Sequence, residues 1–321
     1  LADAVLYLDR AVKADPELAR DAFLPLAEAA WYGHKLDIAR AAAESAAKRT
    51  PKSPDAQFML GRVALSQFSA AKDDTTRQAE ADGHWEAARS ALARASELLG
   101  KPSDAASLET LVRVHVDLGH TYVWKQKLDE AQREYTAAMA GKPALVDMGQ
   151  IQRALGGERF LATLESAVPA LTARPGADVS EIASLTWWLG WARLDQKQFA
   201  KADDAFSAAV AKVPEYVNSW HYIALARFHQ KDYEGSMGAI RKHWDENPSD
   251  LVAEVTGDPE TNLPVLDGLV GWCVRQHRNA EAAFLSELQT NGAPSDSRYW
   301  NNAGLFWRDD GEMLRKSERP E

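Results

Sequence analysis

The stretch that decides the fold is LGWARLDQKQFAKADDAFSAAVAKVP, residues 189–214. Its two small residues, Gly190 and Ala202, lie 12 positions apart. Phe206 and Ala209 then follow Ala202 at steps of four and three, which places the three side chains on one face of a helix. Pro214 ends that helix, because proline lacks an N–H group and clashes with the preceding turn. The stretch therefore predicts a helix with one packed face that stops before Pro214.

The same frame recurs along the chain. Trp220, Ala224 and Pro248 lie 34 residues beyond Thr186, Gly190 and Pro214. Further frames are made by Ala4, Leu8, Ala11 and Pro16, by Ala27, Ala39, Ala46 and Pro51, and by Leu118, Gly119, Tyr122, Ala131, Tyr135, Ala138 and Pro143. Trp300, Gly304 and Trp307 restart the frame near the end. A fixed period of this length is typical of helical repeat proteins.

These residues closely resemble the tetratricopeptide repeat, whose pattern is W-x2-L-G-x2-Y followed by A, F, A and P at fixed offsets. The resemblance implies that each unit is a pair of antiparallel helices, which approach closely at Gly190 and Ala202, while Phe206 fills the gap to the next unit. One unit cannot bury its apolar face alone, so the units must stack. We expect an all-α, right-handed superhelical solenoid of about seven to eight antiparallel helix pairs. The Ala-rich, Arg-rich texture suggests a bacterial protein.

The repeat frame is interrupted at three places within what we expect to be a single array over residues 1–321. A stretched unit lies at 52–102, where Ala88 follows Gly61 by 27 residues rather than 12. The additional residues lie within Phe68 to His84 and form either a solvated loop or extensions of the two helices. An irregular unit at 144–176 contains Gly156-Gly157, and an irregular joint at 247–264 is rich in Asp, Gly and Pro.

Charge and hydropathy exclude several classes of function. The 321 residues carry a formal net charge of −10, which argues against nucleic-acid binding, because that needs clustered Lys and Arg. No apolar run approaches the length of about 18 residues that a membrane span needs. The chain starts at Leu1 without a signal-peptide pattern or an initiator Met, so we expect a mature or trimmed fragment. Both a cytoplasmic and a periplasmic location fit this composition.

The sequence contains no recognisable catalytic, metal or cofactor motif. P-loop, GxGxxG, HExxH and GxSxG patterns are absent. One cysteine, Cys273, excludes an internal disulfide and CxxC zinc sites, and its apolar surroundings favour a buried structural thiol over a nucleophile. The eight histidines are dispersed, so we expect no metal site. We therefore predict a protein that is not an enzyme and holds no cofactor.

The family resemblance implies where a binding surface would lie. In tetratricopeptide proteins the first helix of each unit lines an inner groove, and positions just outside the packing frame face the ligand. Mapping those positions by their offset from the small residue of each unit gives the concave-face candidates Arg113, Val116, His120, Trp124, Trp187, Trp191, His221, Phe228 and Asn301. Some family members bind chaperone C-termini through a clamp of Lys and Asn. Here the clamp positions hold Leu24 and Glu28, Phe58 and Arg62, and Val116 and His120, so that clamp is absent.

Trp187 and Trp191 are the strongest candidates for a contact with a partner. They are four residues apart and so share one helix face. Buried aromatic side chains supply much of the energy of protein interfaces, so the pair is suited to anchor a peptide or a partner helix. The alternative is that both side chains pack against the irregular preceding unit as part of the core, and core packing is favoured over groove contact.

The function expected from these observations is that of a scaffold or adaptor. Such a protein would bind a peptide or another protein in its concave groove, as a subunit of a larger assembly. A second hypothesis is a non-catalytic arm of a larger enzyme, such as a kinase or glycosyltransferase, with its catalytic domain outside this fragment. A third is self-association, in which the incomplete end units stack on another copy of the chain.

Overall fold

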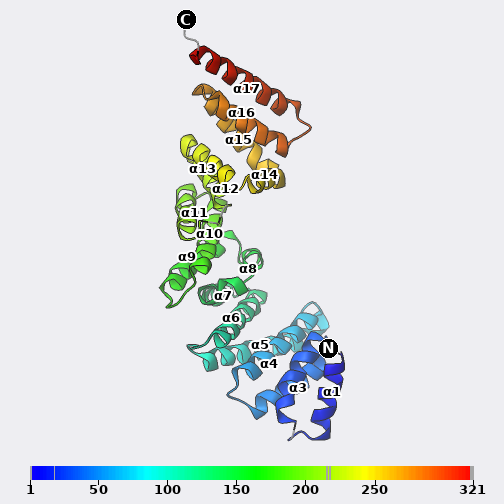
Figure 1. The fold of residues 1–321 in the computed structure, drawn as a ribbon. Coiled ribbons are helices and arrows are strands. Elements are labelled where there is room, and N and C mark those ends of the chain that lie inside the picture. The colour runs from blue at the N-terminus through cyan, green and yellow to red at the C-terminus, as the bar shows by residue number, and fades with distance from the viewer. Residues whose placement is uncertain (1, 18, 215, 217, 319–321) are drawn as a thin grey trace. The chain divides into compact units, whose positions relative to one another are not determined.

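The computed structural model describes residues 2–17, 19–214, 216 and 218–318 (Figure 1). Over these residues it contains seventeen α-helices, three 3₁₀ helices and no strand, so the all-α prediction is confirmed. The chain divides into two compact units, residues 1–177 (unit 1) and residues 178–321 (unit 2). The continuity of both units as one array stays a prediction. Within the described residues, no helix combines the length and the apolar character needed to span a membrane.

Unit 1 consists of helices that pack mainly against their neighbours in sequence, as expected of stacked pairs. Its α-helices are α1 (Ala2–Ala14), α2 (Phe23–Tyr32), α3 (Leu36–Arg49), α4 (Pro54–Ala71), α5 (Gln78–Leu99), α6 (Ala105–Trp124), α7 (Leu128–Gly141), α8 (Met148–Leu155) and α9 (Gly157–Ala173). The 3₁₀ helices are η1 (Arg20–Ala22), η2 (Thr75–Arg77) and η3 (Pro143–Leu145). The frames read from the sequence correspond to the pairs α2–α3, α4–α5 and α6–α7.

Unit 2 is built in the same way, with one short helix added. Its α-helices are α10 (Val179–Asp195), α11 (Phe199–Lys212), α12 (Ser219–His229), α13 (Tyr233–Glu246), α14 (Pro248–Gly257), α15 (Pro259–Arg275), α16 (Asn279–Gly292) and α17 (Ser297–Glu318). The pairs are α10–α11, α12–α13 and α15–α16, and α14 lies between the second and third pairs in sequence. Cys273 is buried in α15, as predicted.

Five helix pairs share one turn that the sequence did not reveal. In each, three residues join the two helices, and the middle residue has a positive φ without being glycine. These residues are His34, Gln126, Lys197, Lys231 and His277, and their φ angles lie between 55 and 66°. The left-handed conformation lets backbone N–H groups bond the last carbonyls of the first helix. At the α6–α7 turn, for example, the amide of Lys127 donates to the carbonyl of Tyr122 at 3.0 Å.

Glycines in the first helix allow a large side chain of the second helix to pack directly on the backbone. A Cβ atom at Gly119 would lie 2.3 Å from Tyr135 Cε1, and one at Gly190 would lie 2.9 Å from Phe206. Both aromatic residues are fully buried. This confirms the close approach that the spacing in residues 189–214 predicts. Phe206 also stacks on Tyr222 of the next pair, with ring centroids 5.2 Å apart, so it joins two successive pairs.

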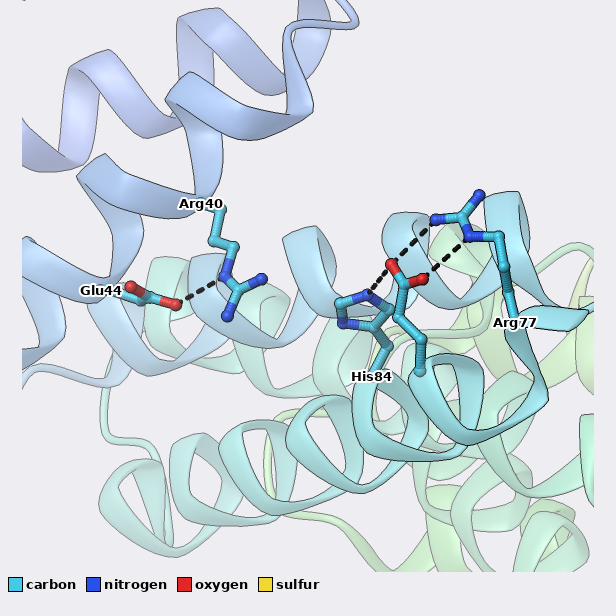
Figure 2. Close-up of polar contacts among 5 residues, drawn as sticks. Arg40, Glu44, Arg77 and His84 are labelled. Atoms are coloured by element: carbon cyan, nitrogen blue, oxygen red, sulfur yellow. Dashed lines mark hydrogen bonds and ion pairs between the residues drawn. The ribbon is translucent and has the colours of Figure 1, made fainter.

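The stretched unit at 52–102 consists of two long helices rather than a long loop. The additional residues extend α4 to 18 residues and α5 to 22. The packing position is kept, because a Cβ at Gly61 would meet Leu92 at 2.6 Å. An ion-pair network joins the end of η2 to the first turns of α5. In it, Arg77 binds Glu80 through Nε and Nη2 at 2.9 and 2.8 Å, and His84 lies 3.3 Å from the same carboxylate (Figure 2).

Figure 2 also shows Arg40 and Glu44 of α3 next to this extension of α5. Arg40 Nε donates to Glu44 Oε1 at 2.7 Å, and both residues line a small hollow together with His84. In the neighbouring network of α5, the hydrogen bonds of Glu80 to Arg77 and then to His84 lower the pKa of Glu80 to about 2. The pairs are solvent-exposed, so they contribute little to stability. They show instead that the polar stretch read from the sequence forms the solvated face of two extended helices.

Candidate functional site

Unit 2 contains a hollow that is lined by four different helices. It has a volume of about 260 Å³. In Figure 1, α14 lies beside α12 within this unit, and the hollow lies among these helices, the end of α10 and the start of α15. Its lining residues are Trp191, Leu194 and Asp195 of α10, His221, Tyr222 and Leu225 of α12, Glu254 of α14, and Asp258, Thr261 and Asn262 at the start of α15. We call this hollow the unit 2 groove.

Two aromatic rings form the apolar wall of the unit 2 groove. Tyr222 is stacked on Phe206, at an interplanar angle of 18°, and Trp187 contacts it edge-on with centroids 5.3 Å apart. Trp191 packs edge-on against Trp188 at 5.8 Å. Trp191 and Tyr222 are half-buried, because each packs on the core with one part and borders the groove with another. The core thus holds both rings in place before any partner arrives.

The charged residues that line the unit 2 groove are acidic. Asp195, Glu254 and Asp258 contribute three carboxylates, and the lining contains no Lys or Arg. Burial raises the pKa of Glu254, and the nearby charges of Asp250 and Asp258 raise it further. The pKa of Tyr222 is raised to about 12, first by burial and then by Glu254 and Asp258, which places these carboxylates close to the phenol. The groove therefore carries a concentrated negative field.

The junction of α14 and α15 holds these carboxylates in position. Asp258 accepts a hydrogen bond from the amide of Thr261 at 3.2 Å and so caps α15. The side-chain amide of Asn262 donates to the carbonyl oxygens of Glu254 at 3.1 Å and of Asp258 at 2.8 Å. Asn262 is buried, so both bonds are shielded from water. This arrangement fixes the direction in which α14 leaves the groove.

His221 forms the floor of the unit 2 groove and is 6% exposed. Its pKa is lowered to about 4, first by burial and then by neighbouring His243, while Asp250 and Asp258 act in the opposite direction. The ring is therefore neutral at pH 7. It lies edge-on to Tyr222 and His243, but among the described residues it makes no side-chain hydrogen bond. His243, in contrast, is paired with Asp250 through Nε2 at 2.9 Å.

Of the concave-face candidates in unit 2, the structure brings two together in the groove and places the others outside it. Trp191 and His221 both line the unit 2 groove. Trp187 packs on Phe206 and Tyr222 in the core, and its buried Nε1 has no hydrogen-bond partner among the described residues. Phe228 packs on Tyr233 and against the backbone of α15 at Gly268, and Asn301 is exposed on α17. Groove contact by these residues stays a prediction.

The candidates in unit 1 all lie on α6, but none of them lines a hollow found among the described residues. Arg113 is exposed beside Glu109. His120 is half-buried against the ring of Tyr135, with centroids 5.7 Å apart. Trp124 is 38% exposed and lies 5.0 Å from the ring of Phe68. In unit 1, His120 and Trp124 therefore take part in the packing of α6 with other helices, whereas Arg113 does not.

Arg62, at one of the clamp positions, is neutralised inside the protein. Its guanidinium lies 4.0 Å from the ring centre of Trp31 and 3.6 Å from Asp117 of α6. Burial raises the pKa of Asp117 to about 6, and Arg62 only partly offsets that rise. Because this cation is engaged by Asp117 and Trp31, it is not available to bind a carboxylate, which agrees with the absence of the clamp in the sequence.

Sequence reasoning missed Tyr222, Glu254, Asp258 and Asn262 as lining residues. All but Tyr222 lie in the segment 247–264, which has no repeat frame and so offered no offset from which to map a position. The available signal was the spacing of Asp250, Glu254 and Asp258, which follow one another at steps of four, although in the structure only the first two lie on α14. The described residues contain no group of three or more His, Cys, Asp and Glu side chains placed to hold a metal ion.

Comparison with known proteins agrees with this geometry. Residues 24–72 and 188–250 match the family model described as tetratricopeptide repeat, and both segments contain a helix pair with the shared turn. The chain contains tetratricopeptide repeats in these two segments. The second matched segment includes Trp191, His221 and Tyr222, so one wall of the unit 2 groove belongs to these repeats, whereas Glu254 and Asp258 lie just beyond them. No curated protein matches the sequence significantly.

Several solved structures of tetratricopeptide-repeat proteins are similar at low identity. The C-terminal part of a repeat-containing protein from Cytophaga hutchinsonii is 12% identical, covering 87% of this chain and 98% of that one, with a TM-score of 0.49. YrrB, described as having an unusual peptide-binding site, is 12% identical, covering 75% and 93%, with a TM-score of 0.35. The TPR2AB domain of yeast Sti1 with pHSP90 is 14% identical, covering 85% and 98%, with a TM-score of 0.29. Likeness at this level carries no argument about function.

Proposed function

We propose that this tetratricopeptide-repeat protein is a scaffold that binds a segment of a partner protein in the unit 2 groove. Tetratricopeptide repeats are, as a class, non-catalytic protein-interaction modules. The observation that carries the proposal is the groove itself, in which side chains from α10, α12, α14 and α15 converge on one hollow beside Trp191. Its volume of about 260 Å³ suits one or two side chains of a protein segment better than a drug-sized ligand.

Site-specific photo-cross-linking in cells tests this proposal. A photoreactive amino acid is placed at Asp195 or Thr261, which are exposed and line the groove, and at Lys201, which is exposed on α11 outside it. We expect a discrete cross-linked partner from the two groove positions and none from Lys201. Equal labelling at all three positions, or labelling at Lys201 alone, would show that this groove is not the binding surface.

Replacement of Trp191 by Ala provides the complementary measurement. Because the indole borders the groove and packs on Trp188, the substitution removes contact area for a partner and some packing of α10. We expect the cross-link from Thr261 to be lost while the far-ultraviolet circular dichroism spectrum stays helical. Unchanged cross-linking and an unchanged melting temperature together would mean that the indole serves neither purpose.

A second candidate, self-association, is favoured by the exposed side of α17. Trp300, Trp307 and Leu314 are 57%, 45% and 57% exposed and follow at steps of seven, which places them on one helix face. The other side of α17 packs on α16 through the buried residues Tyr299 and Ala303. A second copy of the chain would cover this face. Light scattering is expected to show a dimer that Leu314→Lys dissociates, and a monomer at high concentration would exclude this candidate.

A further inference from the structure

We propose that the unit 2 groove recognises a Lys or Arg side chain, so that its partner presents a basic segment. This inference rests on the proposed function, because it assigns the chemistry of the segment that occupies the same groove. Four features of the groove support it: its unbalanced charge, its aromatic wall, its unpartnered histidine and its size.

The charge of the groove is negative and is not balanced from within. The three lining carboxylates Asp195, Glu254 and Asp258 face a lining without Lys or Arg, and the histidine on the floor is neutral at pH 7. Glu254 in particular is half-buried and makes no ion pair with any described residue. A half-buried carboxylate without a cation is unfavourable, and a cationic ligand would relieve that cost. An acidic segment would meet repulsion from all three groups.

The aromatic wall provides the second element of cation recognition. Trp191 and Tyr222 line the groove together with the carboxylates, and the packing of Tyr222 on Phe206 leaves its position fixed. Guanidinium and ammonium groups are attracted to the faces of Trp and Tyr, most strongly where water is excluded. The methylene groups of a Lys or Arg side chain also pack on such rings while the charged end reaches a carboxylate. Aromatic rings beside carboxylates therefore match both parts of a basic side chain.

His221 is an independent indication that a ligand completes the groove. The residue is 6% exposed and lines the hollow, and its ring makes no hydrogen bond to any described residue. Its ring nitrogens are not among the fully buried atoms without a partner, so they border the open space of the groove, where a ligand can reach them. A neutral imidazole has one acceptor nitrogen, which matches the N–H groups of guanidinium or ammonium. Neighbouring His243 is paired with Asp250 through Nε2, although its buried Nδ1 has no partner among the described residues, and of the two histidines only His221 lines the groove.

The volume of the groove limits what it holds. About 260 Å³ is at the lower end of ligand cavities and fits one long side chain with its flanking backbone. Thr261 and Asn262 contribute polar groups at the start of α15, where the backbone of an extended segment would pass. The groove is thus a pocket for a single basic side chain within a longer contact, rather than a site for a whole helix face.

Peptide selection, followed by neutralisation of one carboxylate in the groove, tests the inference. A random 12-residue peptide library displayed on phage is selected on the full chain, after depletion on the Trp191→Ala variant. We expect the selected peptides to be enriched in Lys and Arg. The leading peptide, labelled with fluorescein, is then titrated by fluorescence anisotropy against the wild-type chain, Glu254→Gln and Glu312→Gln. Glu312 is exposed on α17 outside the groove, so its variant changes the net charge equally.

The two charge variants should behave differently. Glu254→Gln is expected to lower the affinity for the peptide about tenfold, because a charge-assisted hydrogen bond is lost. Glu312→Gln should change the affinity by less than about twofold. Replacing the central Arg of the peptide by citrulline, which keeps the shape and removes the charge, should weaken wild-type binding by a similar factor. Glu254→Gln is expected to melt no lower than wild type, because it removes the repulsion among Asp250, Glu254 and Asp258.

The outcomes separate this inference from the proposed function. Peptides without an excess of Lys and Arg, or an equal effect of both charge variants, would overturn the basic-side-chain inference. If Trp191→Ala abolishes binding of such peptides and Glu254→Gln does not, the groove is a binding surface but its ligand is not basic. If no peptide is enriched, or neither groove variant changes the affinity, both proposals are wrong.

Discussion

Replacing Gly119 by Ala tests the close approach of α6 and α7, on which the helix-pair packing depends. The new Cβ would lie 2.3, 2.6 and 2.7 Å from the Cε1, Cδ1 and Cζ atoms of Tyr135. Carbon atoms in favourable contact are about 3.5–4.0 Å apart, so the ring or the helix must move by about 1 Å. Tyr135 is fully buried and its ring is rigid, so it has no free space to enter.

The expected cost follows from two opposing contributions. Overpacking a well-packed core costs about 1–3 kcal/mol, and the size of this overlap places Gly119→Ala near the upper end. Against this, Ala is favoured over Gly within a helix by about 1 kcal/mol. We therefore expect a net loss of about 2 kcal/mol. For a unit of this size that corresponds to a fall in melting temperature of about 4–8 °C.

The assay compares Gly119→Ala with a matched glycine in the same unit. Gly83 lies within α5, and a Cβ there would have no neighbour within 4 Å. Gly83→Ala should therefore show only the gain in helix propensity and stabilise by about 0.5–1 kcal/mol. Urea denaturation followed by circular dichroism measures both. If Gly119→Ala is as stable as Gly83→Ala, the two helices do not approach as described, and the reasoning from the small residues fails.

Three further predictions concern the turn, the buried histidine and the buried thiol. Gln126→Gly, at the positive φ between α6 and α7, should stabilise unit 1 by about 0.5–1 kcal/mol in urea denaturation, and Lys125→Gly, at φ −103°, should destabilise it. His221 has a folded pKa of about 4 against an ordinary value of 6.5, so the unfolded chain takes up its proton first and stability falls as the pH drops through that interval. At pH 5 this lowers the free energy of unfolding by about 2 kcal/mol relative to pH 7.5, and a His221→Gln variant should show a smaller loss on acidification. Burial raises the pKa of Cys273 to about 11, so iodoacetamide at pH 8 should label this thiol only after unfolding, and rapid labelling of the native chain would show that it is not buried.

The repeat architecture was predictable because its signals are local in sequence. Gly190, Ala202 and Phe206 keep a fixed spacing, since the length of a helix and its turn sets which residues meet across a pair. The same rule explains Gly61, which packs on Leu92 even though the helices between them are longer. The positive φ at Lys197 and Lys231 was not predictable, because neither residue is a type that favours the left-handed region.

The candidate site was only half predictable. Trp191 and His221 occupy repeat positions, so their offset from Gly190 and Ala224 led to them. Trp187 was mapped by the same rule but does not line the groove, since its half-buried ring packs edge-on against Phe206 and Tyr222. Glu254 and Asp258 lie outside the repeat frame. Their position in the groove depends on how α14 packs against α13, α15 and α16, and sequence spacing alone does not determine such contacts between elements.

The most direct test of the central claim is a double-mutant cycle between the groove and its ligand. The affinity of the selected basic peptide and of its citrulline counterpart is measured against the wild-type chain and against Glu254→Gln by fluorescence anisotropy. If the cationic side chain lies against this carboxylate, the two changes are not additive, and a coupling energy of about 1 kcal/mol or more is expected. Additive effects within about 0.3–0.5 kcal/mol would place the basic side chain elsewhere and contradict the account.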